Sequence, residues 1–345
     1  MPNLKLIIVG QDGLTHVGGS FRRAALKHGL DVVFFDIRES HSKYSIINSL
    51  LWRLTDHKPA KLRFFSSTVA AYCKNHHPNF LLTTGSAPLM ANDLRIIKQC
   101  ETITANFSTD DPWADSHRSR WQLDSLASYD FIFTPRLANL DEFNRLTRRN
   151  VYYLPFGYDN ELSYQLSDTI QCPSESHDVL FVGGADRDRI ELIKPIINAG
   201  LKIGLVGGYW DQNPVTQPFA LGIKAPVEIN RLTKNAKINL CLVRRSNRDG
   251  HVMRSFEIAA CGGCMVVEDT KEHRNIFGAD GVTVRYFSKT EDAISIIREL
   301  LINPAERARM GMAVFQRITS GRHTYEDRLE TILKTVSLDS GRNPL

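Results

Sequence analysis

Long apolar runs are missing from this 345-residue sequence, and none approaches the roughly 18 residues of a membrane-spanning helix. The opening MPNLKLIIVG is typical of a short strand, whereas a secretory signal has a charged start and a longer apolar segment. Charge of one sign is also scarce, because the net charge is only +5 and the basic residues are spread along the chain. Such a charge does not by itself indicate a nucleic-acid partner. We therefore expect a cytoplasmic protein without stable membrane insertion.

Cysteine is sparse as well, with six residues in the whole chain. Cys261 and Cys264 form a single CxxC, while a structural zinc site of this kind normally needs a second pair. Without a secretion signal, we expect these thiols to be reduced. The sequence therefore predicts neither a metal site nor a resident cofactor.

The length suffices for two domains, and a hydrophobic content of 42% is ordinary for a globular protein. Short apolar segments alternate with helical patterns throughout, which favours parallel sheets covered by helices. We predict an α/β fold of two doubly wound Rossmann-like domains facing a central cleft. The predicted parts are an acceptor-side domain (1–160), a linker poor in periodicity (161–177), a donor domain (178–322) and a C-terminal helix (323–345). Periodicity does not reveal whether that last helix crosses back to the first domain.

The rest of the chain is organised around the stretch from Ile238 to Asp269, which has the pattern strand, polar loop, helix, turn, strand. A helix is predicted over His251–Cys261, and Gly262 and Gly263 end it. The preceding loop is unusually charged, with Arg244, Arg245, Arg248 and Asp249. In open α/β sheets such a loop borders the crevice where ligands bind, and a helix amino end favours phosphate.

Arg254 and Glu257 are three residues apart on this predicted helix and therefore share one face. Their side chains should lean toward the start of the helix. Cations there suit a phosphate, and a carboxylate suits a diol such as a ribose. We infer a nucleotide diphosphate, most simply a nucleotide sugar. The alternative is an ordinary surface loop whose arginines are solvated or paired with nearby acids.

A second phosphate-compatible turn is predicted where Gly183 and Gly184 precede a helix that begins near Arg187. Arg187 and Arg189 supply positive charge there. The string Asp186-Arg187-Asp188 has the form DxD, but acidic residues at a helix start favour the helix dipole, so we do not assign it a metal.

In the first domain, the loop QDGLTHVGGS joins the first strand to a helix predicted over Phe21–His28. Gly18 and Gly19 are expected to make this loop flexible and to let a ligand approach the backbone, beside His16. The glycine spacing is not GxGxxG, which argues against a dinucleotide site. Further along, Asp110 and Asp111 follow a predicted strand and precede a proline. They could orient acceptor hydroxyls or cap a helix that starts at that proline.

Several motifs together carry a resemblance to a known family. The run from Arg244 to Glu257 is followed by ACGG. Further matching motifs are DDPW (110–113), YYLPFGYD (152–159), FVGGADRDR (181–189), NPAER (303–307) and HTYEDR (323–328). Together they resemble the CgeB-type spore-maturation glycosyltransferases, which are group-1-like enzymes of the GT-B fold. The resemblance covers most of residues 100–335.

The resemblance implies a hexosyltransferase that moves a sugar from a nucleotide-diphosphate sugar to an acceptor hydroxyl, without a metal and with retention. The implied donor contacts are Gly183, Gly184, Arg187, Arg189, Arg244, Asp249, Gly250, His251, Arg254 and Glu257. The implied acceptor side comprises His16, Gly18, Gly19, Asp110 and Asp111. The candidates for catalysis are Asp110, Asp111, Asp249, His251 and Arg189. Many group-1-like enzymes carry two glutamates eight positions apart; Glu257 matches the second, whereas the first falls on Asp249.

Three other classes stay open at this point: a nucleotide-sugar epimerase or hydrolase on the same fold, an NAD-dependent oxidoreductase and a non-catalytic sugar-binding protein. The acceptor also stays open, because a glycan, a protein, a small metabolite and a nucleic acid all offer hydroxyl groups.

Overall fold

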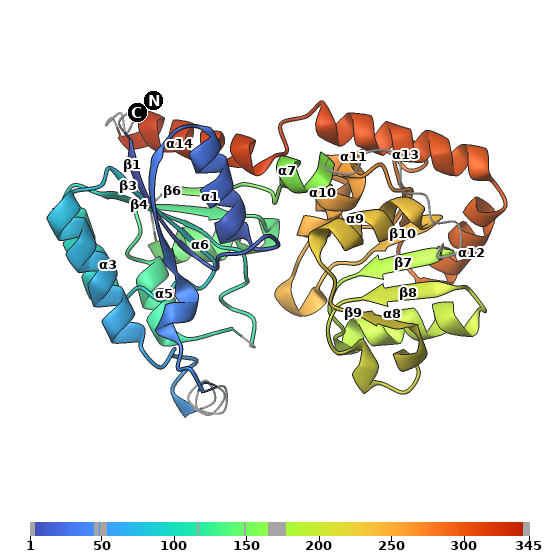
Figure 1. Ribbon diagram of the computed structural model, residues 1–345, viewed down its shortest axis with the longest axis horizontal. Coiled ribbons are helices and arrows are strands. Elements are labelled where there is room, and N and C mark those ends of the chain that lie inside the picture. The colour runs from blue at the N-terminus through green and yellow to red at the C-terminus, as the bar shows by residue number, and fades with distance from the viewer. Residues whose placement is uncertain are drawn as a thin grey trace. The chain divides into compact units, whose positions relative to one another are not determined.

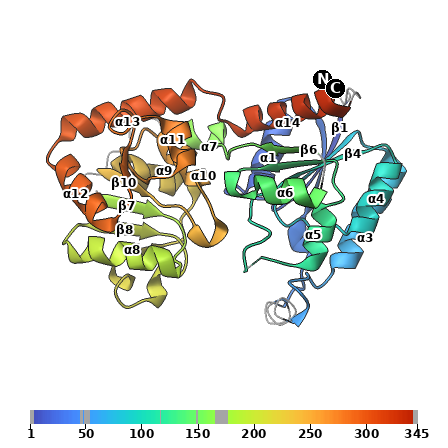
Figure 2. The same cartoon turned by 180° about the vertical axis from the view of Figure 1, so that it is seen from behind.

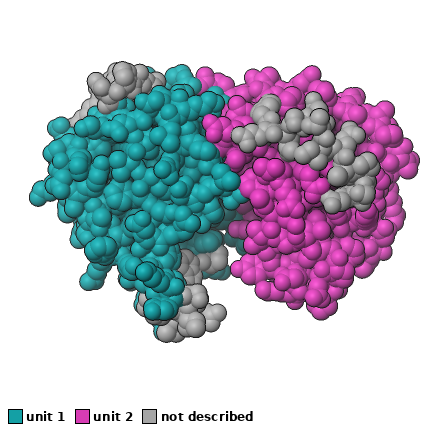
Figure 3. Space-filling model, in the orientation of Figure 1, with its two compact units in different colours: residues 1–155, 246–248, 325–345 teal, residues 156–245, 249–324 magenta. Residues whose placement is uncertain are grey.

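The computed structural model describes residues 4–44, 48, 54–115, 117–147, 150–164 and 177–340. The chain divides into two compact units, coloured teal and magenta in Figure 3. Unit 1 contains residues 1–155, 246–248 and 325–345, and unit 2 contains residues 156–245 and 249–324. None of the described helices is long and apolar enough to cross a membrane.

Unit 1 is built on a six-stranded parallel sheet of order β2-β1-β3-β4-β5-β6. Its strands are β1 (Lys5–Gly10), β2 (Asp31–Asp36), β3 (Phe80–Thr84), β4 (Ile103–Phe107), β5 (Phe131–Thr134) and β6 (Asn150–Tyr153). In the register, Ile7 of β1 lies opposite Val33 on one side and Leu81 on the other. The strand order reverses at β1, which makes the carboxyl edge between β1 and β3 a topological switch point.

The helices of unit 1 cover both faces of this sheet. They are α1 (Val17–Lys27), α3 (Leu62–His76), α4 (Ala91–Gln99), α5 (Arg120–Leu126), α6 (Leu140–Thr147) and α14 (Tyr325–Ser340), with short 3-10 turns η1 (Ile37–Ser40) and η2 (Leu137–Asn139). In Figure 1 α1 lies in front of the sheet, and in the reverse view of Figure 2 α6 does. The C-terminal helix α14 packs beside α1, where Phe21 and Tyr325 meet edge to face at 5.4 Å. Distant ends of the chain therefore complete one core.

Unit 2 repeats the plan, with the order β12-β11-β10-β7-β8-β9. Its strands are β7 (Val179–Val182), β8 (Ile203–Val206), β9 (Ala220–Gly222), β10 (Ile238–Cys241), β11 (Met265–Glu268) and β12 (Arg285–Phe287). Its helices are α7 (Asn160–Tyr164), α8 (Arg187–Asn198), α9 (Pro226–Asn235), α10 (Met253–Ala260), α11 (Lys271–Phe277), α12 (Thr290–Leu301) and α13 (Pro304–Thr319), with 3-10 turns η4 (Trp210–Gln212), η5 (Gln217–Phe219) and η6 (Arg245–Asn247). The two sheets confirm the predicted pair of doubly wound domains. The order reverses between β7 and β10, so the carboxyl ends of these two strands form the ligand-binding edge that such sheets offer.

Gly18 and Gly19 belong to α1 and not to the flexible loop that we predicted. The helix begins at Val17 rather than Phe21, so that Gly18 and Gly19 are buried in its first turn. A Cβ on Gly19 would lie 2.1 Å from the carbonyl oxygen of Gly13, and one on Gly18 would lie 2.8 Å from that of Gln11. Glycine is needed here because the helix and the loop touch through their backbones.

Helix boundaries followed the local signals in some places and not in others. Asn303 caps α13, because its Oδ1 accepts from the Glu306 N–H at 3.1 Å. The N-cap residue of α12 is Lys289, whose side chain makes no capping hydrogen bond. No helix starts at Pro112, since α5 begins only at Arg120. Most of the predicted linker, residues 165–176, lies outside the described part of the chain.

Candidate functional site

Arg189 is a buried cation at the start of α8. Asp186 is the N-cap of this helix, and its Oδ1 accepts from the Arg189 N–H at 2.9 Å. The Arg189 side chain packs over the Phe181 ring at 5.5 Å, and its Nη1 donates to the Gly184 carbonyl at 3.0 Å. The residue is only 7% exposed, and its Nε forms an ion pair with Asp186 Oδ2 at 3.6 Å but has no hydrogen-bond partner in the described structure. A buried guanidinium with an unused hydrogen-bond donor can bind an anion such as a phosphate.

The charged groups that act on Arg189 come from the N-cap of its own helix and from the loop after β10. Burial lowers the pKa of Arg189, and the positive charge of Arg244 lowers it further, whereas Asp186 and Asp249 raise it. Arg244 and Asp249 lie in the loop after β10, and both interact electrostatically with Arg189, which follows β7. The carboxyl ends of the two strands at the switch point therefore bring together three of the predicted donor residues.

The glycine turns after β7 and β8 hold this edge together. Gly207 has φ +137°, and a Cβ there would lie 2.3 Å from the Gly183 carbonyl oxygen. The Ala185 N–H donates to the Gly208 carbonyl at 2.9 Å. The turn that carries Gly183 and Gly184 is thus braced by the next one, and only glycine permits this approach.

The arginines of the loop after β10 differ in their surroundings. Arg245 forms an ion pair with Glu268 at 2.7 Å, and the other Glu268 oxygen accepts from the Val243 N–H at 3.1 Å. Arg244 is exposed, and its side chain has no hydrogen-bond or ion-pair partner within the described ranges. Of these two, Arg244 is the one available to a ligand.

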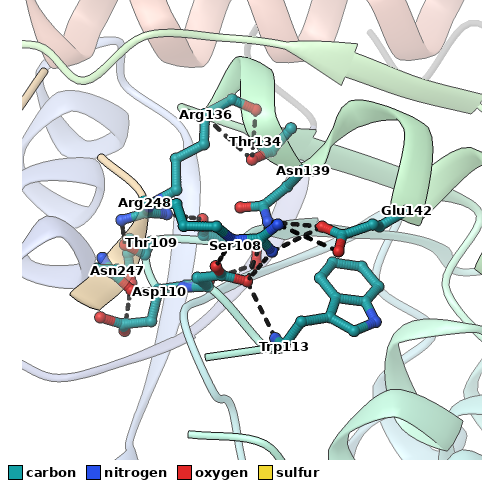
Figure 4. Close-up of polar contacts among 11 residues, drawn as sticks. Ser108, Thr109, Asp110, Trp113, Thr134, Arg136, Asn139, Glu142, Asn247 and Arg248 are labelled. Carbon is teal, nitrogen blue, oxygen red and sulfur yellow. Dashed lines mark hydrogen bonds and ion pairs between the residues drawn. The ribbon is translucent and has the colours of Figure 1, made fainter. Parts of the chain in front are cut away.

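Arg248 belongs to unit 1, where it is clamped by acidic side chains (Figure 4). Its Nε and Nη2 lie 2.5 and 2.9 Å from the two carboxylate oxygens of Asp111, and Nη2 also lies 2.7 Å from Glu142. Asn139 donates to Asp111 at 2.9 Å, and the Asp111 N–H donates to Asn247 Oδ1 at 2.8 Å. Burial pushes the pKa of Asp111 upward, but the hydrogen bonds from Arg248 and its other neighbours outweigh it and lower that pKa.

The fully buried Asp111 carboxylate is therefore a structural ion-pair partner, which contradicts the acceptor-orienting role that we expected of it. Asp110 differs, because it is partly exposed and its Oδ2 accepts only from Thr109 Oγ1, at 3.1 Å, among the described residues. It lies beside Gly85, where an added Cβ would come within 3.4 Å of the carboxylate. Arg136 supports this turn through the Ser108 carbonyl at 3.3 Å (Figure 4). Asp110 thus stays available at the carboxyl edge of unit 1.

Arg254 and Glu257 form an ion pair on α10, so they do share one helical face. Their side chains stay 27% and 20% exposed, which leaves both within reach of a ligand. The charges of Arg189 and Arg254 both act on the thiol of Cys241, at the end of β10. The α10 pair therefore lies near the same strand end as Arg189.

His251 is placed differently from our prediction, because it is 1% exposed and cannot face a sugar. Its Nε2 accepts from the Phe156 N–H at 3.1 Å, so the proton is on Nδ1, which donates to Glu272 Oε2 at 2.5 Å. A Cβ on Gly250 would collide with Glu272 at 2.5 Å. The buried pair of His251 and Glu272 thus packs against Gly250 and holds the loop that contains Asp249. No sequence pattern indicated that Glu272 pairs with His251, because Glu272 belongs to none of the recognised motifs.

His16 lies in unit 1, just before α1, and is partly exposed. Burial lowers its pKa, and the charge of Arg38 lowers it further, while Asp36 and Asp12 act in the opposite direction. The imidazole is therefore neutral at pH 7, as a proton acceptor must be.

Residues 187–334 match a family model described as "Glycosyl transferase-like". This part of the chain contains α8, the loop after β10 and α10. Among curated proteins, the sequence has no significant match.

Solved structures of the GT-B class share the fold at low sequence identity. Sucrose-phosphate synthase from Thermosynechococcus elongatus has a TM-score of 0.69 at 12% identity, covering 97% of this chain and 99% of that one. Anabaena HepE in complex with UDP-glucose has a TM-score of 0.65 at 13% identity, covering 97% and 100%. A putative UDP-N-acetylglucosamine 2-epimerase from Listeria monocytogenes is less similar, with a TM-score of 0.57 at 11% identity, covering 99% and 98%.

These findings define the fold as GT-B. Residues 187–334 are similar to a family described as glycosyltransferase-like. They support glycosyl transfer as the general class of activity.

Proposed function

We propose that this protein is a group-1-like glycosyltransferase of the CgeB type that transfers a hexose from a nucleotide-diphosphate sugar to an acceptor hydroxyl. The observation that carries the proposal is the incompletely bonded, buried Arg189 guanidinium next to the exposed Arg244, at the carboxyl ends of β7 and β10. Two cations at a crevice of this kind match a diphosphate in charge and in position. The solved HepE structure, which shares the fold, contains UDP-glucose.

In the proposed mechanism, Arg189 and Arg244 neutralise the diphosphate as negative charge develops on it during departure from the sugar. This stabilisation uses fixed protein charges, so we propose that transfer does not require a metal ion. Exposed Arg187 lies beside them at the start of α8 and extends the positive surface.

Glu257 is proposed to accept hydrogen bonds from the ribose hydroxyls, with Arg254 holding its carboxylate in place. Asp249 takes the position of the first glutamate in many group-1-like enzymes and is proposed to face the sugar ring, with Gly250 beside it. Retention of the anomeric configuration follows from that resemblance, and NMR of the product anomer tests it.

Asp110 and His16 are proposed to serve the acceptor, because both are partly exposed after strands of the unit 1 sheet. A neutral imidazole can take a proton, and a carboxylate can orient a hydroxyl group. His251 and Asp111 have no part in this proposal because they are buried in ion pairs.

Calorimetric titration of the full chain with UDP, GDP, ADP and dTDP tests the donor site. Arg189→Lys and Glu257→Gln should each raise the Kd of the preferred nucleotide about tenfold or more, since each removes charge-assisted hydrogen bonds. Arg309→Ala is the matched control, because Arg309 lies in unit 2 and pairs only with surface groups, including Glu306 at 2.7 Å. Activity of the wild type should survive EDTA. Equal nucleotide affinity in both variants and the wild type contradicts the donor-site assignment.

The epimerase or hydrolase alternative predicts a different product. Incubation of the preferred sugar nucleotide without acceptor should then yield an epimer or free sugar at full rate, whereas a transferase requires the acceptor for rapid turnover.

A further inference from the structure

A surface hollow of about 450 Å³ lies in unit 2 beside the proposed diphosphate position. One side is the start of α8, including Arg187 and Ile190, and the other is the loop after β8, including Tyr209, Gln212 and Asn213. In Figure 1 this loop, drawn in olive, runs next to α8. The hollow therefore lies at the carboxyl edge of β7 and β8, one strand away from the switch point.

Tyr209 is held at this hollow in an unusual conformation. Its backbone is left-handed, with φ 70° and ψ 0°, a region that non-glycine residues rarely adopt. The side chain is 65% exposed, and its hydroxyl has no hydrogen-bond partner among the described residues. Residues held in such rare backbone conformations cluster at active sites and ligand-binding sites.

The neighbouring residues explain why the ring stays at the surface. Trp210 is fully buried, its Nε1 donates to the Gly183 carbonyl at 2.7 Å, and Thr216 Oγ1 donates to its carbonyl at 2.7 Å. With Trp210 fixed inward, the left-handed conformation of Tyr209 is imposed by the fold, which leaves its ring at the mouth of the hollow.

The hollow adjoins the turn that leads to the proposed diphosphate position, because Ala185 and Asp186 line it. Gly208, which directly precedes Tyr209, accepts from the Ala185 N–H at 2.9 Å. Ala185 directly follows Gly184, whose carbonyl accepts from Arg189. The hollow and the Arg189 side chain therefore meet at the same turn, between Gly184 and the start of α8.

We propose that the hollow receives the nucleobase of the donor and that the base stacks on the Tyr209 ring. The proposal rests on the function proposed above and deepens it. Every base has a π-face, so stacking supplies affinity without selecting among bases. Gln212 and Asn213 carry amide donors and acceptors that can read the edge of the base. Tyr209 would thus contribute affinity for any nucleotide, and these amides would determine which base is preferred.

The test compares the affinity for nucleotides with the affinity for inorganic pyrophosphate, which has no base. Tyr209→Gly removes the ring while keeping the left-handed backbone at no steric cost. Its Kd for UDP, GDP and ADP should rise about 5- to 150-fold, the range expected for loss of one base stack, while its Kd for pyrophosphate stays unchanged. Tyr209→Phe keeps an aromatic ring and should bind nucleotides like the wild type.

Tyr44→Ala is the matched control, because Tyr44 is similarly exposed, at 70%, but lies in unit 1. Unchanged nucleotide affinity in Tyr209→Gly overturns this inference alone. Equal weakening for nucleotides and pyrophosphate also overturns it, because the ring would then only support the diphosphate turn. A wild type that binds pyrophosphate and no nucleotide overturns the proposed function as well.

Discussion

Removing Arg248 should destabilise unit 1 and make its stability depend differently on pH. The Asp111 carboxylate is 0% exposed, and Arg248 provides two of its contacts, at 2.5 and 2.9 Å. Breaking a buried pair from one side typically costs about 3–5 kcal/mol, because the remaining charge is uncompensated. Arg248 is 40% exposed, and Asn139 and the Trp113 N–H still donate to Asp111, so we expect about 2–3 kcal/mol for Arg248→Ala at pH 7.

The direction of the pH effect follows from the pKa of Asp111, which is lowered in the folded wild type. A carboxyl group whose pKa is lowered by folding stabilises the protein above its unfolded pKa of about 3.9. This stabilisation is lost as the pH falls through the folded-state pKa. Without Arg248, burial raises that pKa instead, so the buried charge costs stability at pH 7. The difference between wild type and Arg248→Ala should therefore be largest near neutral pH and shrink below about pH 4.

Urea unfolding of the full chain, followed by circular dichroism at pH 7 and pH 4, measures this difference. Arg38→Ala is the control within unit 1, because Arg38 is 63% exposed in its pair with Asp36, and exposed pairs contribute little to stability. Adding Asp111→Asn to Arg248→Ala should restore stability at pH 7 by removing the unpaired charge. If Arg248→Ala costs no more than Arg38→Ala, or costs the same at both pH values, the buried-charge reasoning is refuted.

Two further predictions concern unit 2 and the thiols. Gly207→Ala should destabilise the protein by more than about 3 kcal/mol, because its Cβ would lie 2.3 Å from the Gly183 carbonyl oxygen, whereas Gly222→Ala has open space and should cost about 1 kcal/mol from its positive φ alone. Comparable thermal unfolding of both variants would contradict this. Burial raises the pKa of the Cys241 thiol to about 12, so iodoacetamide at pH 8 should label Cys100, which is partly exposed, and spare Cys241 until urea is added. Mass spectrometry that finds Cys241 alkylated in the native protein would show that strand end to be open.

Local sequence signals predicted the parts of the site that lie on one element. The spacing of Arg254 and Glu257 placed them on one face of α10, where they pair. Pro226 is the first residue of α9, a position that its fixed φ favours. A turn of two glycines before Arg187 likewise predicted the start of α8. These features depend on helical geometry and on backbone conformations over a few residues, which the local sequence contains.

Glycine illustrates where a local signal was misread. Gly18 and Gly19 suggested a flexible loop, but their lack of a Cβ serves close contact with the backbone of Gln11 and Gly13. The same composition fits both uses, and only the packing partner distinguishes them.

The sequence by itself determined two α/β domains, the strand β10 and the cations in the loop that follows it, because these depend on periodicity and on short-range spacing. Only the tertiary structure decided which charges are free. Asp111 and Arg248 are 137 positions apart, and His251 and Glu272 are 21 apart, yet each pair is buried together. The order of the strands brings such residues into contact, and burial then converts a charge that looks catalytic in the sequence into one that stabilises the fold.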